Sequence, residues 1–485
     1  MIIAMNGALS MLKVNGGRIV DADNQPVRLR GVCIGGWMNM ENFINGYPGA
    51  EYTLRAAMAR ELGPAKASFF FDRMLDYFLA EDDLRFIKGC GATAVRLPLN
   101  YRHFEADAQP FMYLETGFAR LQRVVDWCAG LGLYVILDLH AAQGWQSTDW
   151  HCDNAHCQAL FWEHPHFQDR FVALWEEFAR RFKDNAAIAG YNIMNEPVCN
   201  AHGGRYVYET ARDWDKMNRI YRRVVTAIRA LDPAHIIFLE GDNFATLFEG
   251  LEAPFAPNLV YSSHNYNPAG VGHGRYPGTI NGEWWDRRRQ RAKFQEHPGT
   301  QFAVKHNVPL YVGEFGASAN GLSRQRPCRL RALDDQIDVF EEHGVHWTTW
   351  TYKDVGVMSW VRLDPESEYL KLIAPVLKAK IFLHTDSGAC WLPPTRPLGV
   401  VRGLGRLVAK TAGYTDVNPK ANEYYLKRLL LDGYAGSMLQ PLYAGKFKGM
   451  TETEIDRILQ SFAFKNCRPY DGLVEVVRKH MGRPV

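Results

Sequence analysis

Short apolar runs alternate with longer amphipathic segments over most of the chain. The apolar runs are β-prone and predict buried parallel strands, whereas the intervening segments have the period of helices. Eight strands interleaved with helices favour a closed (β/α)8 TIM barrel, an α/β fold, over an open doubly wound sheet, which remains the alternative. The predicted strands are 29–35, 92–97, 133–139, 188–194, 235–239, 259–263, 309–313 and 345–350, and the clearest helical segments are 72–89, 118–130, 166–183, 211–230 and 331–343.

Both ends of the chain depart from this alternation. Residues 11–30 predict a hairpin with its turn at Asn15-Gly16-Gly17, placed to close the bottom of the barrel. After about residue 366 the pattern becomes helical only, over 368–382, 400–411, 420–431 and 452–464, with a capping box at Thr451-Glu-Thr-Glu454. We therefore predict a barrel with its hairpin over residues 1–366 and a helical C-terminal extension, packed on the barrel, over residues 367–485.

Composition narrows the class of protein. A length of 485 residues suits a barrel of about 250 to 400 residues with additions. A net charge of +3 gives no reason to expect a nucleic-acid partner, and no stretch approaches the ~20 apolar residues of a membrane span. The N-terminus has no visible signal and the nine cysteines are scattered, which predicts reduced thiols and a cytoplasmic protein, unless a signal was removed. The oligomeric state stays open.

Polar side chains stand at the ends of the predicted strands, where a barrel core would otherwise take Val, Ile and Leu. Singly, each could have a structural role. Because the carboxyl ends of all barrel strands meet at one face, together they predict a functional site. These residues are Arg96, His140, Asn195, Glu196, His264, Tyr266, Glu314 and Trp350.

Glu196 and Glu314 close two of the strands, in Gly190-Tyr-Asn-Ile-Met-Asn-Glu196 and Leu310-Tyr-Val-Gly-Glu314. A pair of carboxylates is what cleaves a glycosidic bond: one protonates the leaving oxygen and, in retaining enzymes, the other attacks the anomeric carbon, with the two carboxyl groups about 5 Å apart. The acid needs a raised pKa, which a neighbouring carboxylate provides, and the nucleophile must stay ionised, which Arg96 would favour. Tyr266 could donate a hydrogen bond to the nucleophile.

Five motifs together resemble glycoside hydrolase family 5, the cellulase-like family of retaining glycosidases in clan A, over about residues 10–365. They are Asn195-Glu196-Pro197, Gly313-Glu314-Phe-Gly316, Val95-Arg96-Leu97-Pro98, Asp138-Leu139-His140 and His264-Asn-Tyr266. The resemblance implies a carbohydrate substrate, no cofactor, Glu196 as acid/base and Glu314 as nucleophile. It also implies that Asn195 binds the sugar 2-hydroxyl, that Arg96 and Tyr266 orient the nucleophile, that His140 and His264 line the reaction subsite, and that Trp350 is the sugar-stacking platform.

Loops rich in aromatic residues should shape the substrate site, and Trp37 and Trp145 are predicted to contact substrate. The loops are 35–50, Trp145–Phe161 and 264–285, the last with Trp284 and Trp285. Because loops that close one end of a cleft leave a pocket for a chain end, we predict an exo-acting β-glycosidase for small β-glycosides or oligosaccharides. An endo-β-1,4-glucanase, a transglycosylase and a non-catalytic carbohydrate-binding barrel remain the alternatives.

Three other patterns suggest different chemistry but are better explained structurally. His151-Cys152-Asp153 with His156-Cys157 lacks the Cys-x-x-Cys spacing of structural zinc, so we predict a loop over the cleft and no metal. The basic run Arg287–Lys293 predicts a solvated helix face. Gly403-Leu-Gly405 has no preceding strand and is no dinucleotide fingerprint.

Overall fold

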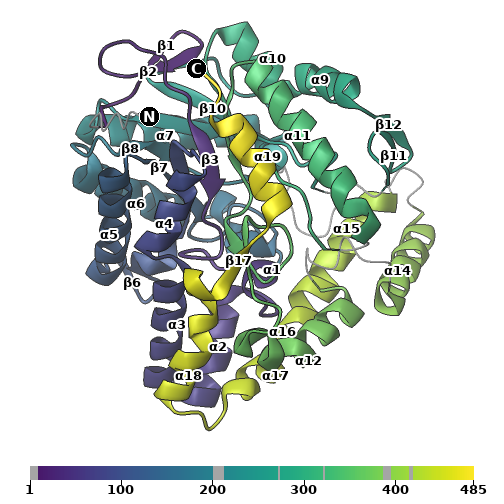
Figure 1. Ribbon diagram of the computed structural model, residues 1–485. Helices are drawn as coiled ribbons and strands as arrows, with labels where there is room; N and C mark the ends of the chain where they lie inside the picture. The colour runs from purple at the N-terminus through teal and green to yellow at the C-terminus, as the bar shows by residue number, and fades with distance from the viewer. Residues whose placement is uncertain are drawn as a thin grey trace.

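The structure is a computed structural model that describes residues 9–199, 212–270, 274–320, 323–385, 395–413 and 419–484. Its centre is a closed barrel of eight parallel strands, in the order β10-β13-β14-β3-β4-β7-β8-β9 (Figure 1). All eight predicted strands are confirmed. They are β3 (Arg30–Cys33), β4 (Ala94–Asn100), β7 (Tyr134–Ala141), β8 (Ile188–Asn192), β9 (Ile236–Glu240), β10 (Leu259–His264), β13 (Leu310–Glu314) and β14 (His346–Thr349).

The predicted hairpin closes the bottom of the barrel. It consists of β1 (Lys13–Asn15) and β2 (Arg18–Val20), paired antiparallel. Leu12 and Ile19 are buried in one apolar cluster with barrel side chains such as Tyr134 and Phe238. Apolar packing at this end leaves the opposite end, at the carboxyl ends of the strands, for polar groups.

Helices cover the outside of the barrel: α3 (Pro64–Phe78), α4 (Glu81–Gly89), α5 (Glu115–Leu131), α6 (Pro165–Phe182), α7 (Trp214–Leu231), α9 (Arg287–Glu296), α10 (Pro298–His306) and α11 (Arg326–Glu342). The single helix predicted over 72–89 is wrong. The backbone is extended at Leu79, and the Asp83 side chain accepts a hydrogen bond from the Ala80 amide, which starts a second helix. The basic run lies on α9 as predicted, where Arg287 and Arg291 pair with Glu342.

The insertion after β3 and several short strands complete the barrel part. Helices α1 (Asn42–Asn45) and α2 (Glu51–Leu62) follow β3. Beyond the barrel, the paired short strands are β5 (Glu105–Ala106) with β6 (Gln109–Tyr113), β11 (Gly278–Ile280) with β12 (Glu283–Trp285), and β15 (Lys353–Asp354) with β16 (Val361–Leu363). Residues 271–273 of the predicted 264–285 loop lie outside the described residues.

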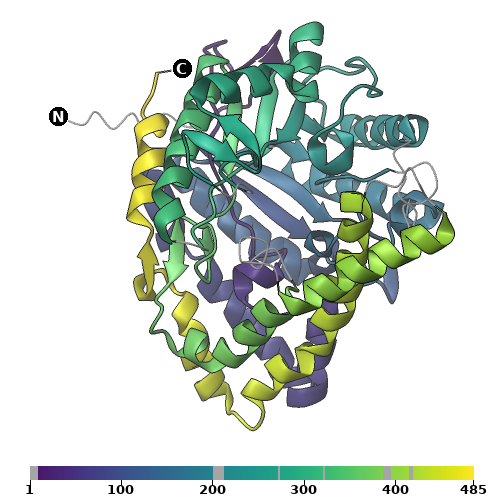
Figure 2. The same ribbon diagram turned by 90° about the vertical axis from the view of Figure 1, so that its right-hand side faces the viewer.

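The C-terminal extension is helical, as predicted, and wraps around one side of the barrel (Figure 2). Thr451 and Glu454 form the predicted capping box. The three-residue strand β17 (Cys467–Pro469) was too short to predict and pairs antiparallel with β16. The helices are α12 (Glu368–Leu383), α14 (Arg396–Ala412), α15 (Pro419–Lys427), a π-helical segment (Arg428–Ala435), α16 (Gly436–Met438), α17 (Gln440–Ala444), α18 (Glu452–Leu459) and α19 (Asp471–Met481). The domain boundary at residue 366 stays a prediction.

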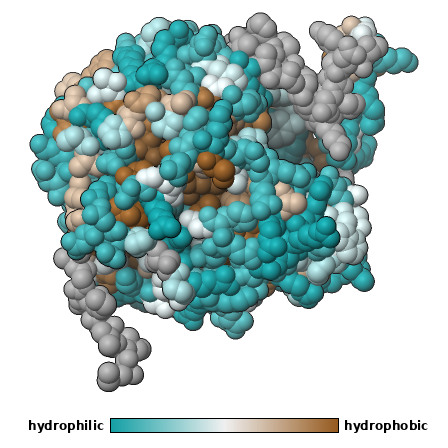
Figure 3. All heavy atoms as spheres, turned by 90° about the horizontal axis from the view of Figure 1, so that it is seen from above, coloured by the Kyte–Doolittle hydropathy of each residue, from teal (hydrophilic) through white to brown (hydrophobic). Residues whose placement is uncertain are grey.

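The surface agrees with the moderate charge of the chain. Seen from above, hydrophilic residues dominate the outline of the molecule, and hydrophobic residues gather towards the middle of that face (Figure 3). Among the described helices, none combines the length and the apolar character that crossing a membrane requires. The eight cysteines within the described ranges have free thiols.

Candidate active site

The predicted polar residues converge at the carboxyl ends of the barrel strands. Arg96 and His140 lie on β4 and β7, His264 and Glu314 end β10 and β13, and the remaining four follow their strands within four residues. Glu240, at the end of β9, belongs to the same group and was not predicted. The rule that found the others would have found it, because it is an ionisable residue that closes an apolar strand.

Arg96 contacts several of the polar side chains of the site. It is completely buried, and its guanidinium donates to Glu314 Oε1 at 2.6 Å and to Asn195 Oδ1 at 2.7 Å. The same group lies 3.2 Å from both Asp138 and Glu240. Burial would lower the pKa of Arg96, but these carboxylates raise it well above its ordinary value. Arg96 therefore carries a permanent positive charge next to Glu314, Asp138 and Glu240.

Glu314 is held by a donor on each carboxylate oxygen. Arg96 binds Oε1, and the Tyr266 hydroxyl donates to Oε2 at 2.8 Å. Burial, together with the charges of Glu314 and Glu196, raises the pKa of Tyr266 well above its ordinary value, so this phenol remains a neutral donor. The two donors fix the orientation of the carboxylate.

Glu196 lies between two imidazoles. His264 Nδ1 is 2.7 Å from Glu196 Oε1, and His151 Nε2 is 3.3 Å from Oε2. Burial would raise the pKa of Glu196, but the hydrogen bond from His264 and the charges of the neighbouring histidines lower it to about 2. The predicted rise in this pKa is therefore wrong for the empty site, because the sequence argument counted the carboxylate neighbour and omitted the histidines.

The surroundings of His264 favour the protonated ring. Burial would lower the pKa of His264, yet Glu314, Glu240 and the bond to Glu196 raise it well above its ordinary value. His264 Nε2 also lies 3.4 Å from Glu240, whose other oxygen accepts from the Glu196 amide at 2.8 Å. Glu240 thus contacts both the His264 ring and the backbone of Glu196, the residue that this ring contacts.

The two carboxylates are close together. One oxygen of Glu196, one of Glu314 and a ring nitrogen of His264 lie within 4.8 Å of one another, in agreement with the separation of about 5 Å predicted for a retaining pair. By distance alone these three groups could ligate a metal ion. We assign them instead to glycosyl and proton transfer, since hydrogen bonds from Arg96, Tyr266 and His264 already orient both carboxylates.

His140 and Trp350 form a stacked pair at the side of the site. Their ring centres are 5.4 Å apart and their planes differ by 11°. His140 contacts Asp138 through Nδ1 at 2.8 Å and Glu41 through Nε2 at 3.3 Å. Glu41, from the loop after β3, was not predicted, and burial raises its pKa to about 7. A carboxyl group whose pKa is about 7 therefore lines the site.

These groups line a cavity of about 400 Å³. The predicted residues Glu196, Glu314, His140, Tyr266 and Trp350 all reach it, and His151 enters from a loop first considered for metal binding. Further residues, which were not predicted individually as site residues, also line the cavity: Glu41, Phe43, Asp149, Trp150, Phe244, Met358, Tyr424 and Arg428. Trp150 and His151 confirm that the 145–161 loop covers the cleft.

Residues 65–356 match the family model described as cellulase (glycosyl hydrolase family 5). The chain belongs to glycoside hydrolase family 5. It is therefore a glycosidase that hydrolyses O-glycosyl bonds, and its reaction is the hydrolysis of a β-glycoside. The resemblance in the five motifs, and the fold expected from it, are confirmed.

Family 5 relatives differ in how much of the chain they match. A "Beta-xylosidase" of Phanerodontia chrysosporium is 36% identical over 97% of this chain and 98% of its own length. "Endoglucanase C" of Acetivibrio thermocellus is 26% identical and covers 63% of this chain and 93% of its own. The solved structure titled "Crystal structure of endogalactoceramidase" has a TM-score of 0.52 at 19% identity, over 71% of this chain and 75% of its own, and shows the shared fold.

Two predicted substrate contacts of this family 5 enzyme are wrong. Trp37 is only 1% exposed and packs in the main hydrophobic core. Trp145 is half-buried, and its indole nitrogen donates to the Asp153 carbonyl at 2.9 Å beside Tyr52. Both tryptophans stabilise the loops on which they lie, and neither reaches the catalytic cavity. Sequence position within a cleft loop does not reveal which face of the loop a side chain takes.

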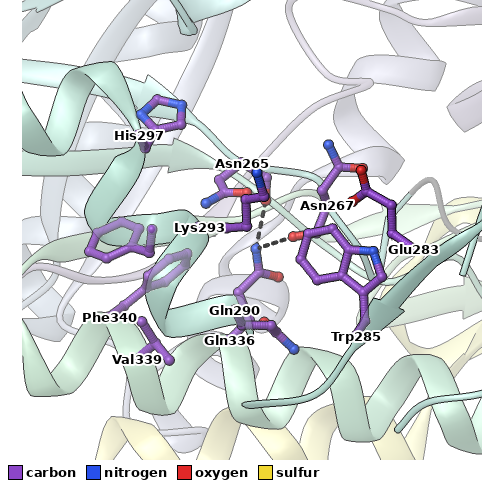
Figure 4. Close-up of a pocket in the computed structure, with 11 residues that line it drawn as sticks. Asn265, Asn267, Glu283, Trp285, Gln290, Lys293, His297, Gln336, Val339 and Phe340 are labelled. Carbon is purple, nitrogen blue, oxygen red and sulfur yellow. Dashed lines mark hydrogen bonds between the residues drawn. The ribbon is translucent and has the colours of Figure 1, made fainter. Parts of the chain in front are cut away.

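A second cavity, of about 280 Å³, lies behind segment 264–267 and is lined by neither Glu196 nor Glu314 (Figure 4). Gln336, from α11, donates to the carbonyl oxygens of Asn265 at 2.8 Å and Asn267 at 3.2 Å. These two bonds flank Tyr266 on both sides. Gln336 therefore helps to hold the tyrosine that orients Glu314.

The buried pair of His140 and Asp138 makes a prediction about pH. Burial would lower the pKa of His140, but Asp138 and the bond to Glu41 raise it to about 10. With 6.5 as the unfolded value, the stabilising effect of the charged ring is complete below pH 6.5 and is lost as the pH rises towards 10. We expect the difference in unfolding free energy between wild type and His140→Asn to shrink over this range, by up to about 1.4 kcal/mol per pH unit.

Urea unfolding at intervals from pH 6 to pH 9 measures this difference directly. His306→Asn is the matched control, because His306 is the last residue of α10 and does not line the cavity. A difference for His140→Asn that stays constant over the range would contradict the charged state of His140.

Proposed function

We propose that the protein is a retaining, exo-acting β-glycosidase that takes small β-glycosides or oligosaccharides. The observation that carries this proposal is the close pair Glu196 and Glu314, with Arg96 and Tyr266 on the second member. Two carboxyl groups this close leave no room for the water that an inverting enzyme needs between base and sugar.

In the first step, a Glu314 oxygen attacks the anomeric carbon while Glu196 protonates the glycosidic oxygen, and the aglycone leaves as an alcohol. In the second step, Glu196 accepts a proton from water, the water oxygen bonds to the anomeric carbon, and Glu314 leaves as a carboxylate. Arg96 and Tyr266 hold Glu314 in both steps. Asn195 Oδ1 accepts a hydrogen bond from Arg96 at 2.7 Å, and we expect Asn195 to bind the 2-hydroxyl of the sugar.

His264 supplies the acid step with its proton. His264 Nδ1 lies 2.7 Å from Glu196 Oε1, so a proton can pass between them when the sugar is bound. Glu196 then donates it to the leaving oxygen. This arrangement lets a carboxyl group that is ionised in the empty enzyme act as an acid once the sugar is bound.

The exo preference rests on how the cavity is enclosed. Phe43 and Glu41 come from the loop after β3, and Trp150 and His151 come from the loop after β7. Walls from separate loops suit a pocket for a chain end better than an open groove. The full-length match to a protein named "Beta-xylosidase" supports the same reading, whereas the match to "Endoglucanase C" leaves 37% of this chain uncovered.

Time courses on a soluble β-glucan and a soluble xylan separate exo from endo action. We expect reducing sugar to rise while the viscosity falls slowly, because each event removes only a chain end. Chromatography of early products should show monosaccharide. A rapid loss of viscosity with few reducing ends would identify internal cleavage and favour the endoglucanase alternative.

A panel of 4-nitrophenyl β-glycosides, with xyloside, glucoside, mannoside and galactoside, tests the class of sugar. Product analysis with an added acceptor sugar separates hydrolysis from transglycosylation. Turnover of any member excludes a non-catalytic barrel. A cytoplasmic location remains a prediction that fractionation of cells would test.

A further inference from the structure

The C-terminal extension reaches the catalytic cavity. Tyr424, on α15, and Arg428, at the start of the π-helical segment, line the same cavity as Glu196 and Glu314. The family match ends at residue 356, so these residues lie outside it. A part of the chain beyond the barrel therefore contributes to the wall of the substrate site.

Buried carboxylates anchor this wall. The Tyr424 hydroxyl donates to Asp149 Oδ2 at 2.5 Å, and Arg428 lies 3.2 Å from the same oxygen. Asp432, which is 3% exposed, binds Arg428 at 2.7 Å and Lys427 at 2.8 Å. Buried ion pairs of this kind hold their partners in one geometry, because an unpaired charge would be costly. The position of Tyr424 is thus fixed relative to the 145–161 loop.

Aromatic rings form the inner surface at this point. The Arg428 guanidinium carbon lies 4.8 Å from the centre of the Tyr424 ring and 5.8 Å from that of Trp150. Trp150 in turn meets Phe43 edge to face, with 5.6 Å between ring centres. Sugar rings present apolar C–H faces, and aromatic side chains offer matching surfaces. Tyr424 therefore extends an aromatic wall that begins on two barrel loops.

The extension also fixes the loop that carries Glu41 and Phe43. Lys380, on α12, donates to the carbonyl oxygens of Asn42 at 2.8 Å and Tyr47 at 2.6 Å. Gln440, on α17, donates to those of Pro48 and Ala50 at 3.1 and 3.0 Å. Two helices of the extension thus hold the backbone of this loop from Asn42 to Ala50, and the loop bears two of the cavity's side chains.

We propose that the extension completes the substrate site, with Tyr424 as a substrate-contacting residue that limits substrate length and Arg428 as the positioning residue that holds its ring. The inference rests on the proposed glycosidase function and deepens it. It assigns the preference for small β-glycosides to a segment outside the barrel. The chemistry recognised is the apolar face of a sugar ring or of an aromatic aglycone.

The test uses the full-length protein with Tyr424→Ala. Probes are 4-nitrophenyl β-xyloside and β-glucoside for short substrates, and xylotetraose and cellotetraose for long ones. We expect kcat/KM on the short substrate to fall on the order of tenfold, mainly through KM, as for the loss of one apolar contact in a binding pocket. The ratio of long to short substrate activity should rise, because the wall opens. Arg428→Met should shift this ratio in the same direction.

Tyr424→Phe separates the ring from its hydroxyl and should keep most of the wild-type preference. Tyr434→Ala is the matched control: Tyr434 lies on the same π-helical segment but is 67% exposed and outside the cavity, so kinetics should not change. If Tyr424→Ala is insoluble, Tyr424→Leu should shift preference in the same direction by a smaller factor. Kinetics and preference for Tyr424→Ala equal to those of Tyr434→Ala would overturn the inference while leaving the glycosidase function intact. A wild-type protein that cleaves no β-glycoside would instead overturn the proposed function.

Discussion

Glu314→Ala should leave a folded protein that has lost activity by roughly four orders of magnitude or more on every substrate, because the group that forms the covalent bond is missing. Folding should survive. Arg96 keeps Asp138 and Glu240 at 3.2 Å, so its buried charge stays compensated. Initial rates on activated and natural glycosides, with the thermal midpoint beside them, measure both effects.

Azide provides a sharper test of this assignment. The alanine side chain opens space beneath the anomeric carbon, where azide can attack directly and restore turnover. The product should be an α-glycosyl azide, since this single displacement inverts the centre. Glu366→Ala is the control, as its side chain is 77% exposed and its rates should not change. Near-native rates for Glu314→Ala without azide would remove Glu314 from the mechanism.

The loss of activity in Glu196→Ala should depend on the leaving group of the substrate. A general acid contributes typically 10²- to 10⁴-fold, and we expect roughly this loss on alkyl glycosides and oligosaccharides. Dinitrophenyl glycosides need little protonation, so their first step should be nearly spared. Without a base for the second step, the glycosyl-enzyme should accumulate and produce a burst. Pre-steady-state kinetics on both substrate types measure this contrast.

Azide again distinguishes the roles. With Glu196→Ala it attacks the glycosyl-enzyme and should yield a β-glycosyl azide, the opposite anomer to that from Glu314→Ala. His264→Gln is a useful companion, because it keeps Glu196 but removes the imidazole that holds its proton. We expect the alkaline limb of its pH profile, which reports loss of the acid's proton, to move while the leaving-group dependence stays moderate. Equal losses on all leaving groups for Glu196→Ala would exclude it as the acid.

The sequence predicted the barrel well because its strands are buried on both faces and therefore read as continuous apolar runs. The site residues on those strands were predictable for the same reason. A charged residue such as Arg96 or Glu314 at the end of an apolar run has few structural explanations in a barrel. Glu240 fits this rule equally, and its omission was avoidable.

Site residues in the loops and in the C-terminal extension were harder to predict from the sequence. Trp37 and Trp145 lie in the predicted cleft loops but do not line the cavity, whereas Glu41 and His151 in the same loops do. Tyr424 lies more than 100 residues after the last catalytic glutamate, and no local pattern links it to the site. The prediction for the pKa of Glu196 was wrong for the same reason. This pKa depends on the distances of His264 and His151 from the carboxylate, which only the fold determines. Long-range contacts, and not local preference, set these features.

The central claim is a double displacement at Glu314 with Glu196 as acid/base, and the stereochemistry of the first product tests it most directly. A β-glycoside from the active panel is hydrolysed in deuterated buffer with enough enzyme to outpace mutarotation, and the anomeric proton is followed by NMR. We expect the β-anomer to appear first and the α-anomer to follow only by mutarotation. Initial formation of the α-anomer would show inversion and contradict the account.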